Sequence, residues 1–310
     1  MGMKILVTGS AGFIGRNVVG RLLARGHTVV GVDSLEPRVH RDRPRAPKDV
    51  EFYHAHVANC PYVAFCDADT VIHLAAQVGV ADSMADPLRY VRENTLETAY
   101  FLLELTRAHN LKRIVVASSM SVYGEGGIHV REDAPCVPMS VYGQTKYDQE
   151  RLVRIWGQQH NILAVALRLF NVYGPGQALH NPYTGVLANF ANWLLKDLPP
   201  VIYGDGTQMR DWVYVADVAE AVCRAATEDV PADTYNICTG AKTTLLEATR
   251  ILTAALGKHI RPDITHQERP GDILHCTGDP TLARDRMGWY ATVPLVEGLT
   301  TYADWLKENR

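Results

Sequence analysis

A tyrosine and a lysine stand four residues apart, at Tyr142 and Lys146. Residues with this spacing share one face of a helix, so the phenol and the ammonium group would lie side by side. A nearby ammonium favours the phenolate, and we therefore expect a lowered pKa for Tyr142, which suits a general base. Such a pair alone is common on helices, and its meaning depends on what lies around it.

Serine side chains lie upstream of this pair, where a strand is expected to end. Ser118, Ser119 and Ser121 follow the apolar run 114–117. Ligands of open α/β sheets bind beyond the carboxyl ends of the strands. A hydroxyl at this point can hydrogen-bond the same substrate oxygen that Tyr142 deprotonates, so the sequence predicts one shared site.

The N-terminal segment joins a short apolar strand, residues 5–7, to three spaced glycines and a helical pattern over 13–24. Gly9 permits a tight turn, Gly12 lets backbone approach a pyrophosphate, and Gly15 allows close packing of the helix on the sheet. The N-terminus of that helix offers free N–H groups to an anion. This order of strand, glycines and helix predicts a dinucleotide site.

The end of the second expected strand carries Asp33, 18 residues after Gly15. A carboxylate there accepts hydrogen bonds from the adenosine ribose and repels a 2′-phosphate, which favours NAD over NADP. Arg38 lies close enough in sequence to keep NADP as an alternative.

Strand and helix patterns alternate through the first half of the chain, which predicts an α/β fold with a doubly wound parallel sheet of the Rossmann type. Further strands are expected at 28–32, 71–74, 114–117 and 164–168, and long helices at 87–109 and 142–159. After Asn171 glycine and proline become frequent and the elements shorten. We expect a dinucleotide-binding domain over 1–170 plus about 211–240, and a smaller α/β substrate-binding lobe over 171–210 and 241–310.

Composition narrows the function classes. The 310 residues are 47% hydrophobic and 21% charged, with a formal net charge of −3, which gives no reason to expect a nucleic-acid or membrane partner. Six cysteines occur without a C-x-x-C pair, and the histidines have no ligand spacing, so we expect no metal site and a reducing, cytoplasmic location. The N-terminus does not resemble a signal peptide.

Several motifs together resemble the extended short-chain dehydrogenases that act on nucleotide sugars. Most similar are the UDP-glucose 4-epimerase group and its dTDP-6-deoxysugar 4-epimerase relatives. The motifs follow the family order at residues 8–15, 73–76, 118–124, 142–146, 168–174, 210–211 and 269–272.

The resemblance implies a role for individual residues. Tyr142 would be the base, Lys146 its partner and a ligand of the nicotinamide ribose, and Ser119 the catalytic hydroxyl; Ser119 and Tyr142 would also contact the sugar. The residues that would hold NAD are Gly9, Gly12, Phe13, Ile14, Gly15, Asp33, Leu74, Ala75, Ala76, Asn94 and Lys146.

The same resemblance implies how a nucleotide-diphosphate sugar would bind. Asn171, Arg210 and Arg269 would contact the diphosphate, for which a guanidinium group is well suited. Cys276 falls at a gatekeeper position beside the sugar, where a small residue would admit N-acetylhexosamines as well as plain hexoses. The alternative is that Cys276 is a small residue of the core.

Within the family, Met120 and Ser121 stand where the 4,6-dehydratases and decarboxylases carry acid–base residues. Their side chains lack that chemistry, which leaves NAD-dependent C4 epimerisation through a transient 4-keto sugar. The alternatives are a dTDP-6-deoxysugar 4-epimerase and a reductase or dehydrogenase on the same fold. A non-enzymatic dinucleotide sensor is disfavoured by the presence of Tyr142, Lys146 and Ser119. The resemblance also implies a homodimer that pairs helices 87–109 and 142–159, which agrees with their apolar residues Tyr100, Leu103, Leu152, Ile155 and Trp156.

Overall fold

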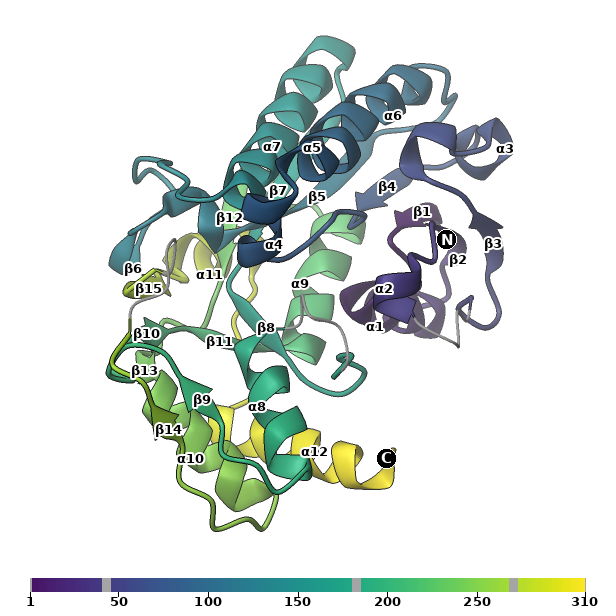
Figure 1. Cartoon of the computed structure of the whole chain (residues 1–310). Helices are drawn as coiled ribbons and strands as arrows, with labels where there is room; N and C mark the ends of the chain where they lie inside the picture. The colour runs from purple at the N-terminus through teal and green to yellow at the C-terminus, as the bar shows by residue number, and fades with distance from the viewer. Residues whose placement is uncertain (1, 41–45, 180–184, 268–272, 310) are drawn as a thin grey trace.

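A computed structural model of the chain describes residues 2–40, 46–179, 185–267 and 273–309. Its centre is a seven-stranded sheet of parallel neighbours in the order β12-β7-β5-β4-β1-β2-β3 (Figure 1). This sheet confirms the predicted fold class. Its strands are β1 (Lys4–Thr8), β2 (Thr28–Asp33), β3 (Glu51–His54), β4 (Thr70–His73), β5 (Arg113–Ser119), β7 (Leu163–Leu169) and β12 (Thr234–Ile237).

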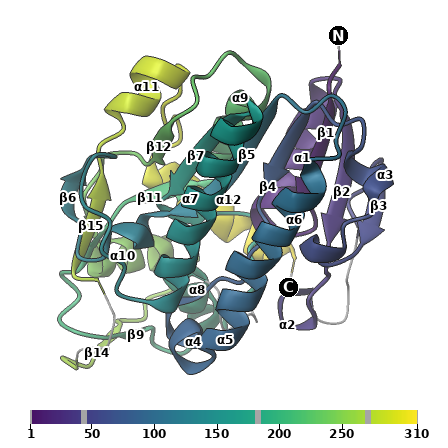
Figure 2. The same cartoon turned by 90° about the horizontal axis from the view of Figure 1, so that it is seen from above.

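Both faces of the sheet are buried, because successive side chains of a strand point to opposite faces. In β1, Ile5 and Val7 share a hydrophobic core with helices α1 (Phe13–Ala24) and α9 (Val215–Thr227). Leu6 enters a second core, with α6 (Glu97–Leu105) and α7 (Val141–His160), which lie side by side across that face (Figure 2). Within the described residues, no helix is long and apolar enough to span a membrane.

The long helix predicted over 87–109 is confirmed over 87–105, but it contains a π-helical stretch and ends earlier than predicted. Residues of this segment form α5 (Pro87–Tyr90), a π-helical stretch η2 (Val91–Leu96) and then α6. After Leu105 the backbone turns away, and the N–H of His109 donates to the carbonyl of Cys66 at 2.8 Å. Short π-helical stretches are often found at functional sites, and this one carries Asn94.

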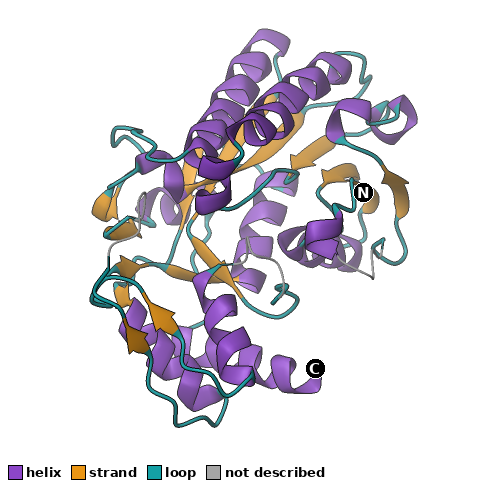
Figure 3. Ribbon diagram, viewed as in Figure 1, coloured by secondary structure: helices purple, strands orange, loops and turns teal. Residues whose placement is uncertain are grey.

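The smaller part of the molecule lies below the sheet in Figure 1, built around its own core of apolar residues from α8 (Val186–Leu195), α10 (Leu245–Ala255) and α12 (Leu295–Glu308). Its strands form the sheet β13-β10-β15-β6 and the pairs β11-β8 and β14-β9 (Figure 3). Their bounds are β6 (Gly127–Val130), β8 (Asn171–Tyr173), β9 (Val201–Ile202), β10 (Met209–Arg210), β11 (Trp212–Tyr214), β13 (Thr243–Thr244), β14 (Asp263–Ile264) and β15 (His275–Gly278).

The predicted division into a dinucleotide-binding domain and a substrate-binding lobe stays a proposal. Two elements cross the border between them. Strand β6 comes from the first half of the chain yet pairs with β15, and α11 (Thr281–Met287) packs Ala283 and Met287 into a core of the main sheet. The remaining short elements are α2 (Pro37–His40), η1 (Val57–Asn59), α3 (Tyr62–Phe65), α4 (Val80–Ala85) and η3 (Met120–Tyr123).

A buried ion pair ties α7 to the sheet. The Arg168 guanidinium contacts both carboxylate oxygens of Glu150, at 2.6 and 3.1 Å, and donates to the Tyr123 hydroxyl at 2.8 Å. Ser118 donates to the same carboxylate at 2.9 Å. Buried charges are tolerated when they are paired and hydrogen-bonded, and this network satisfies both groups just behind the end of β5.

We predict that Arg168→Met lowers the free energy of unfolding by about 3–5 kcal/mol, because Glu150 is left as an unpaired buried charge. Arg286→Met is the matched control, since Arg286 pairs with Asp233 at the surface and its side chain is 47% exposed. That change should cost about 0–1 kcal/mol. Urea unfolding of both variants measures the free energy of unfolding that each loses. Equal losses would show that the buried ion pair contributes no more to stability than the surface pair.

Candidate active site

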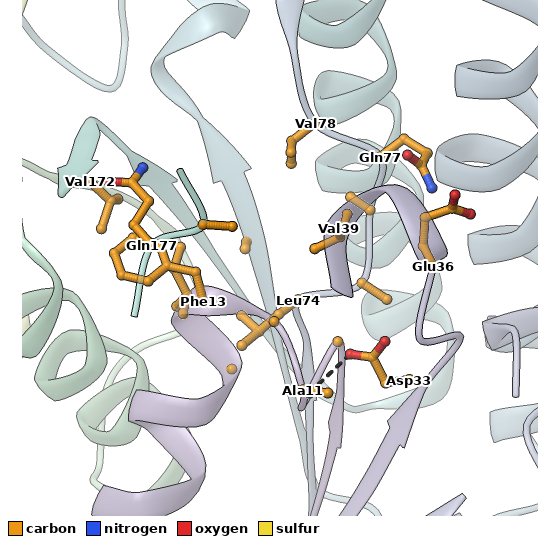
Figure 4. Close-up of a pocket in the computed structure, with 18 of the residues that line it drawn as sticks. Ala11, Phe13, Asp33, Glu36, Val39, Leu74, Gln77, Val78, Val172 and Gln177 are labelled. Atoms are coloured by element: carbon orange, nitrogen blue, oxygen red, sulfur yellow. Dashed lines mark hydrogen bonds between the residues drawn. The ribbon is translucent and has the colours of Figure 1, made fainter. Parts of the chain in front are cut away.

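A pocket of about 790 Å³ opens where the strands of the main sheet reach their carboxyl ends. It receives residues that follow β1, β2, β4, β5 and β7, together with residues of the smaller part such as Leu195 and Leu306. In Figure 4, Phe13, Val172 and Gln177 lie on one side of this pocket and Asp33, Glu36 and Val39 on the other. Of the predicted site residues, those that line it are Gly9, Gly12, Phe13, Ile14, Gly15, Asp33, Leu74, Ala75, Ala76, Ser119, Tyr142 and Lys146.

The glycine turn after β1 fits a dinucleotide. Gly9 has a φ of 68°, and a Cβ at Gly15 would lie 2.0 Å from the carbonyl oxygen of Gly9, so the helix can approach the turn only without a side chain there. Helix α1 begins after Gly12 without a side-chain cap, which leaves its first N–H groups facing the pocket mouth. Backbone N–H groups at a helix N-terminus suit the pyrophosphate of NAD.

The carboxylate of Asp33 is held by this turn. It accepts a hydrogen bond from the amide of Ala11 at 2.9 Å (Figure 4). It also accepts one from the amide of Leu35 at 2.8 Å and lies 3.5 Å from His40 Nε2. Burial alone would raise the pKa of Asp33, but hydrogen bonds from His40, Leu35 and Ala11 outweigh it and hold that pKa below its usual range. Asp33 therefore remains ionised.

A second carboxylate, Glu36, also lines this end of the pocket, and sequence reasoning missed it. Its position three residues after Asp33 was the available signal. Arg38, because of which NADP was retained as an alternative cofactor, is exposed and does not line the pocket. The Glu36 carboxylate is paired with Arg89 at 2.9 Å, so the preference for NAD rests on Asp33.

The start of α7 brings Tyr142 to Ser119. Ser140 caps the helix by accepting from the amide of Gly143 at 3.0 Å, and a Cβ at Gly143 would lie 2.6 Å from the carbonyl oxygen of Ser121. This close approach packs the start of α7 against the segment after β5, and Tyr142 and Ser119 line the same pocket. Ser119 ends β5 and caps η3, accepting from the Ser121 amide at 3.2 Å, so its hydroxyl is fixed.

The pKa values of the pair differ from the sequence expectation. Burial raises the pKa of Tyr142, and the hydrogen bond with Ser119 opposes this shift. Burial also lowers the pKa of Lys146 to about 7, partly offset by Glu150. The ammonium of Lys146 donates to Gln149 Oε1 at 2.7 Å. The predicted lowering of the Tyr142 pKa by Lys146 is therefore wrong, because desolvation dominates and the lysine is engaged elsewhere.

Some predicted residues lie away from the pocket lining. Asn94 is fully buried and supports the loop after β4, donating to the Gln77 carbonyl at 3.0 Å and accepting from the Gln77 amide at 2.7 Å. Asn171 donates to the carbonyl of Asp211 at 3.2 Å, and Arg210 to the carbonyl of Leu274 at 3.1 Å. Their roles stay predictions.

The last two predicted substrate residues are Cys276 and Arg269. Cys276 is fully buried in β15, next to Arg210, which is the placement expected of its alternative role as a small core residue. Arg269 lies outside the described residues.

Strand β3 ends at His54, and His56 comes after it, lining the pocket with Nδ1 3.4 Å from Glu97 Oε1. Among the described residues, no three His, Cys, Asp or Glu side chains group as metal ligands do.

Comparison with known proteins identifies the family. The model of the NAD dependent epimerase/dehydratase family matches residues 5–238. The chain belongs to this family. The extended short-chain dehydrogenase resemblance is thereby confirmed, as is NAD as the cofactor of this enzyme.

Relatives match the chain over nearly its whole length. A dTDP-L-rhamnose 4-epimerase of Burkholderia thailandensis is 31% identical, over 99% of this chain and 96% of its own. The UDP-glucose 4-epimerase of Thermotoga maritima, solved with UDP-glucose, superposes with a TM-score of 0.92 at 31% identity, covering 99% of both chains. The UDP-glucose 4-epimerase of Thermus thermophilus, solved with NAD, gives 0.89 at 33%, covering 99% of this chain and 100% of its own.

We predict that this family member binds NAD at least about tenfold more tightly than NADP, because a 2′-phosphate would face the Asp33 carboxylate. Asp33→Ala should bring the dissociation constants of NAD and NADP closer to each other. Asp67→Ala is the control, since its side chain is 57% exposed and far along the chain from the cofactor motif. Calorimetric titration with NAD and with NADP measures the two dissociation constants. Equal constants for the unmodified protein would show that Asp33 does not contact the adenosine ribose.

Proposed function

We propose that the chain interconverts C4 epimers of a nucleotide-diphosphate hexose, such as UDP-glucose and UDP-galactose. The observation that carries this proposal is one pocket that joins a dinucleotide cradle to Tyr142, Lys146 and Ser119. Met120 and Ser121, next along the chain, offer no acid–base pair for eliminating water. Epimerisation needs one base, one hydroxyl and bound NAD, which matches this set of residues.

In the proposed reaction Tyr142 removes the proton of the sugar 4-hydroxyl, and Ser119 hydrogen-bonds the same oxygen. Lys146 holds the nicotinamide ribose from its buried position. The glycine cradle would hold NAD, which would supply the redox chemistry by taking up the C4 hydride and giving it back on the other face, while Tyr142 returns the proton to the sugar oxygen. Because turnover needs the ionised phenol, we expect the ionisation of Tyr142, whose pKa is raised, to govern the rise of turnover with pH on the acid limb of the kcat–pH profile.

The nucleotide and the sugar are the finer part of the proposal. UDP is favoured by the solved relative that holds UDP-glucose, and the dTDP-L-rhamnose relative keeps dTDP-6-deoxysugars as the second candidate. Activity on N-acetylhexosamines stays a prediction without support from Cys276, whose side chain is buried.

We also propose a cytoplasmic location. All six cysteines are free, and two of them, Cys223 and Cys238, lie in the core without a disulfide. Free thiols persist in reducing compartments.

A homodimer is proposed through α6 and α7. Leu103 is 62% exposed and Ile155 56% exposed, and Tyr100 is exposed beside them on neighbouring helices. Leu152 and Trp156, also predicted for this surface, are partly buried against the sheet. A group of large exposed apolar side chains on adjacent helices is typical of a protein interface.

The proposed reaction is tested by incubating the NAD-bound protein with a panel of UDP- and dTDP-hexoses, including UDP-N-acetylglucosamine. Inversion at C4 is followed by proton NMR without added cofactor. A 4-epimerase converts the sugar with catalytic NAD, whereas a reductase or dehydrogenase consumes cofactor in equal amount. No inversion with any sugar of the panel would remove the proposal.

We predict that Tyr142→Phe lowers kcat by at least about a hundredfold, because the titrating oxygen of the base is lost. Binding of NAD and of the nucleotide sugar should stay close to that of the unmodified protein, since the ring remains. Steady-state kinetics and calorimetry measure both. Turnover within tenfold of the unmodified protein would show that Tyr142 is not the base.

For the interface, we predict that Leu103→Glu converts the dimer to a monomer, because an ionised carboxylate would be buried between the subunits. Leu246→Glu serves as the control: it also replaces an exposed leucine, at 41%, but on α10. Sedimentation velocity at micromolar concentration separates the species. A monomeric unmodified protein would contradict the proposed dimer.

A further inference from the structure

Behind the wall of the pocket, buried side chains form a continuous hydrogen-bond chain that the roles above leave unexplained. Lys146 Nζ donates to Gln149 Oε1 at 2.7 Å. Gln149 Nε2 lies 2.9 Å from Thr98 Oγ1 and 3.1 Å from His73 Nε2. His73 Nδ1 lies 2.8 Å from Thr8 Oγ1. All five side chains are buried.

The chemistry of the groups determines which atom donates and which accepts in each hydrogen bond of this network. An ammonium has donors alone, so the amide oxygen of Gln149 must accept, which turns its NH₂ toward Thr98 and His73. His73 Nε2 then accepts and Nδ1–H donates to Thr8, as a neutral imidazole can. Burial, with Lys146 nearby, lowers the pKa of His73 to about 3 and so keeps it neutral. The Thr98 hydroxyl donates onward to the Asn94 carbonyl at 2.5 Å.

These hydrogen bonds connect the ends of β1 and β4, which lead into the cofactor loops, to helix α7. Thr8 is the last residue of β1 and precedes the glycine turn, and His73 is the last residue of β4 and precedes Leu74. Lys146 and Gln149 belong to α7, which carries Tyr142. A shift of the Gln149 side-chain amide would therefore disturb the loops that follow Thr8 and His73, and also the position of Lys146.

The surroundings of Lys146 make the Gln149 oxygen important. The titratable groups nearby are Tyr142 and Glu150 on α7 and His73 at the end of β4. Glu150 is already engaged by Arg168 and Ser118, and His73 is neutral. A buried ammonium without an acceptor would lose its proton, because desolvation penalises the charged form.

We propose that Gln149 is a positioning residue, which favours the charged form of Lys146 and holds its ammonium in place at the wall of the pocket. This inference rests on the proposed catalytic use of Tyr142 and Lys146. Gln149 does not line the pocket, so it acts through the lysine and not on the substrate.

The direct test is the titration of Lys146 in the NAD-bound protein, followed by NMR of lysine labelled with ¹³C at Cε and assigned with Lys146→Met. Gln149→Met removes the acceptor and should lower the Lys146 pKa by about one pH unit or more. Gln149→Glu supplies a charged acceptor and should raise it. Gln159→Met, an exposed glutamine of the same helix, is the matched control and should leave it unchanged.

Kinetics give the second readout. Gln149→Met should lower kcat by about ten- to a hundredfold and move the alkaline limb of the kcat–pH profile to lower pH. Gln149→Glu should move that limb to higher pH. A purely structural role would lower the melting temperature and leave the limb in place.

The outcomes separate this inference from the proposed function. An unmoved Lys146 titration in Gln149→Met overturns the inference. If Gln149→Met does not fold, a Gln149→Glu variant whose Lys146 pKa is not raised overturns it equally. The NMR titration needs no substrate, so a failed sugar panel with the expected titration shifts would reject the proposed reaction and leave the lysine–glutamine contact established.

Discussion

Burial of the parallel sheet on both faces is the constraint on which the site depends. Inside the central strands, such as β1, the side chains on both faces meet a hydrophobic core, as Ile5 and Leu6 do, which leaves little room for polar chemistry there. Polar groups appear where the strands end, at Thr8, His73 and Ser119. Because the strands run parallel, these ends meet at one edge, and the cofactor cradle and the catalytic residues share one pocket.

Polar groups just behind that edge are buried, and burial would destabilise them without partners. Two networks supply these partners. Glu150 with Arg168 neutralises a charge pair behind β5, and Gln149 with His73 satisfies the ammonium of Lys146. Satisfied networks of this kind hold side chains in single orientations, which fixes Lys146 and the helix that carries Tyr142 against the end of β5.

Much of this could be predicted from local sequence. The helix over 13–24, the glycine turn and Asp33 are local patterns, and each lies where it was expected. The π-helical stretch at Val91–Leu96 was missed because it preserves the apolar pattern of a helix. Glu36 and Gln149 were missed because polar residues on a loop or helix look solvent-exposed until the fold buries them or turns them to a pocket.

By itself the sequence determined the order of strands and helices, the dinucleotide turn and the residue types of the catalytic set, since these depend on neighbours along the chain. The tertiary structure decided which groups meet and in what dielectric. It placed Cys276 in the core, engaged Lys146 with Gln149 and raised the pKa of Tyr142. Desolvation and hydrogen bonding are set by residues distant in sequence, so spacing along one helix cannot predict them.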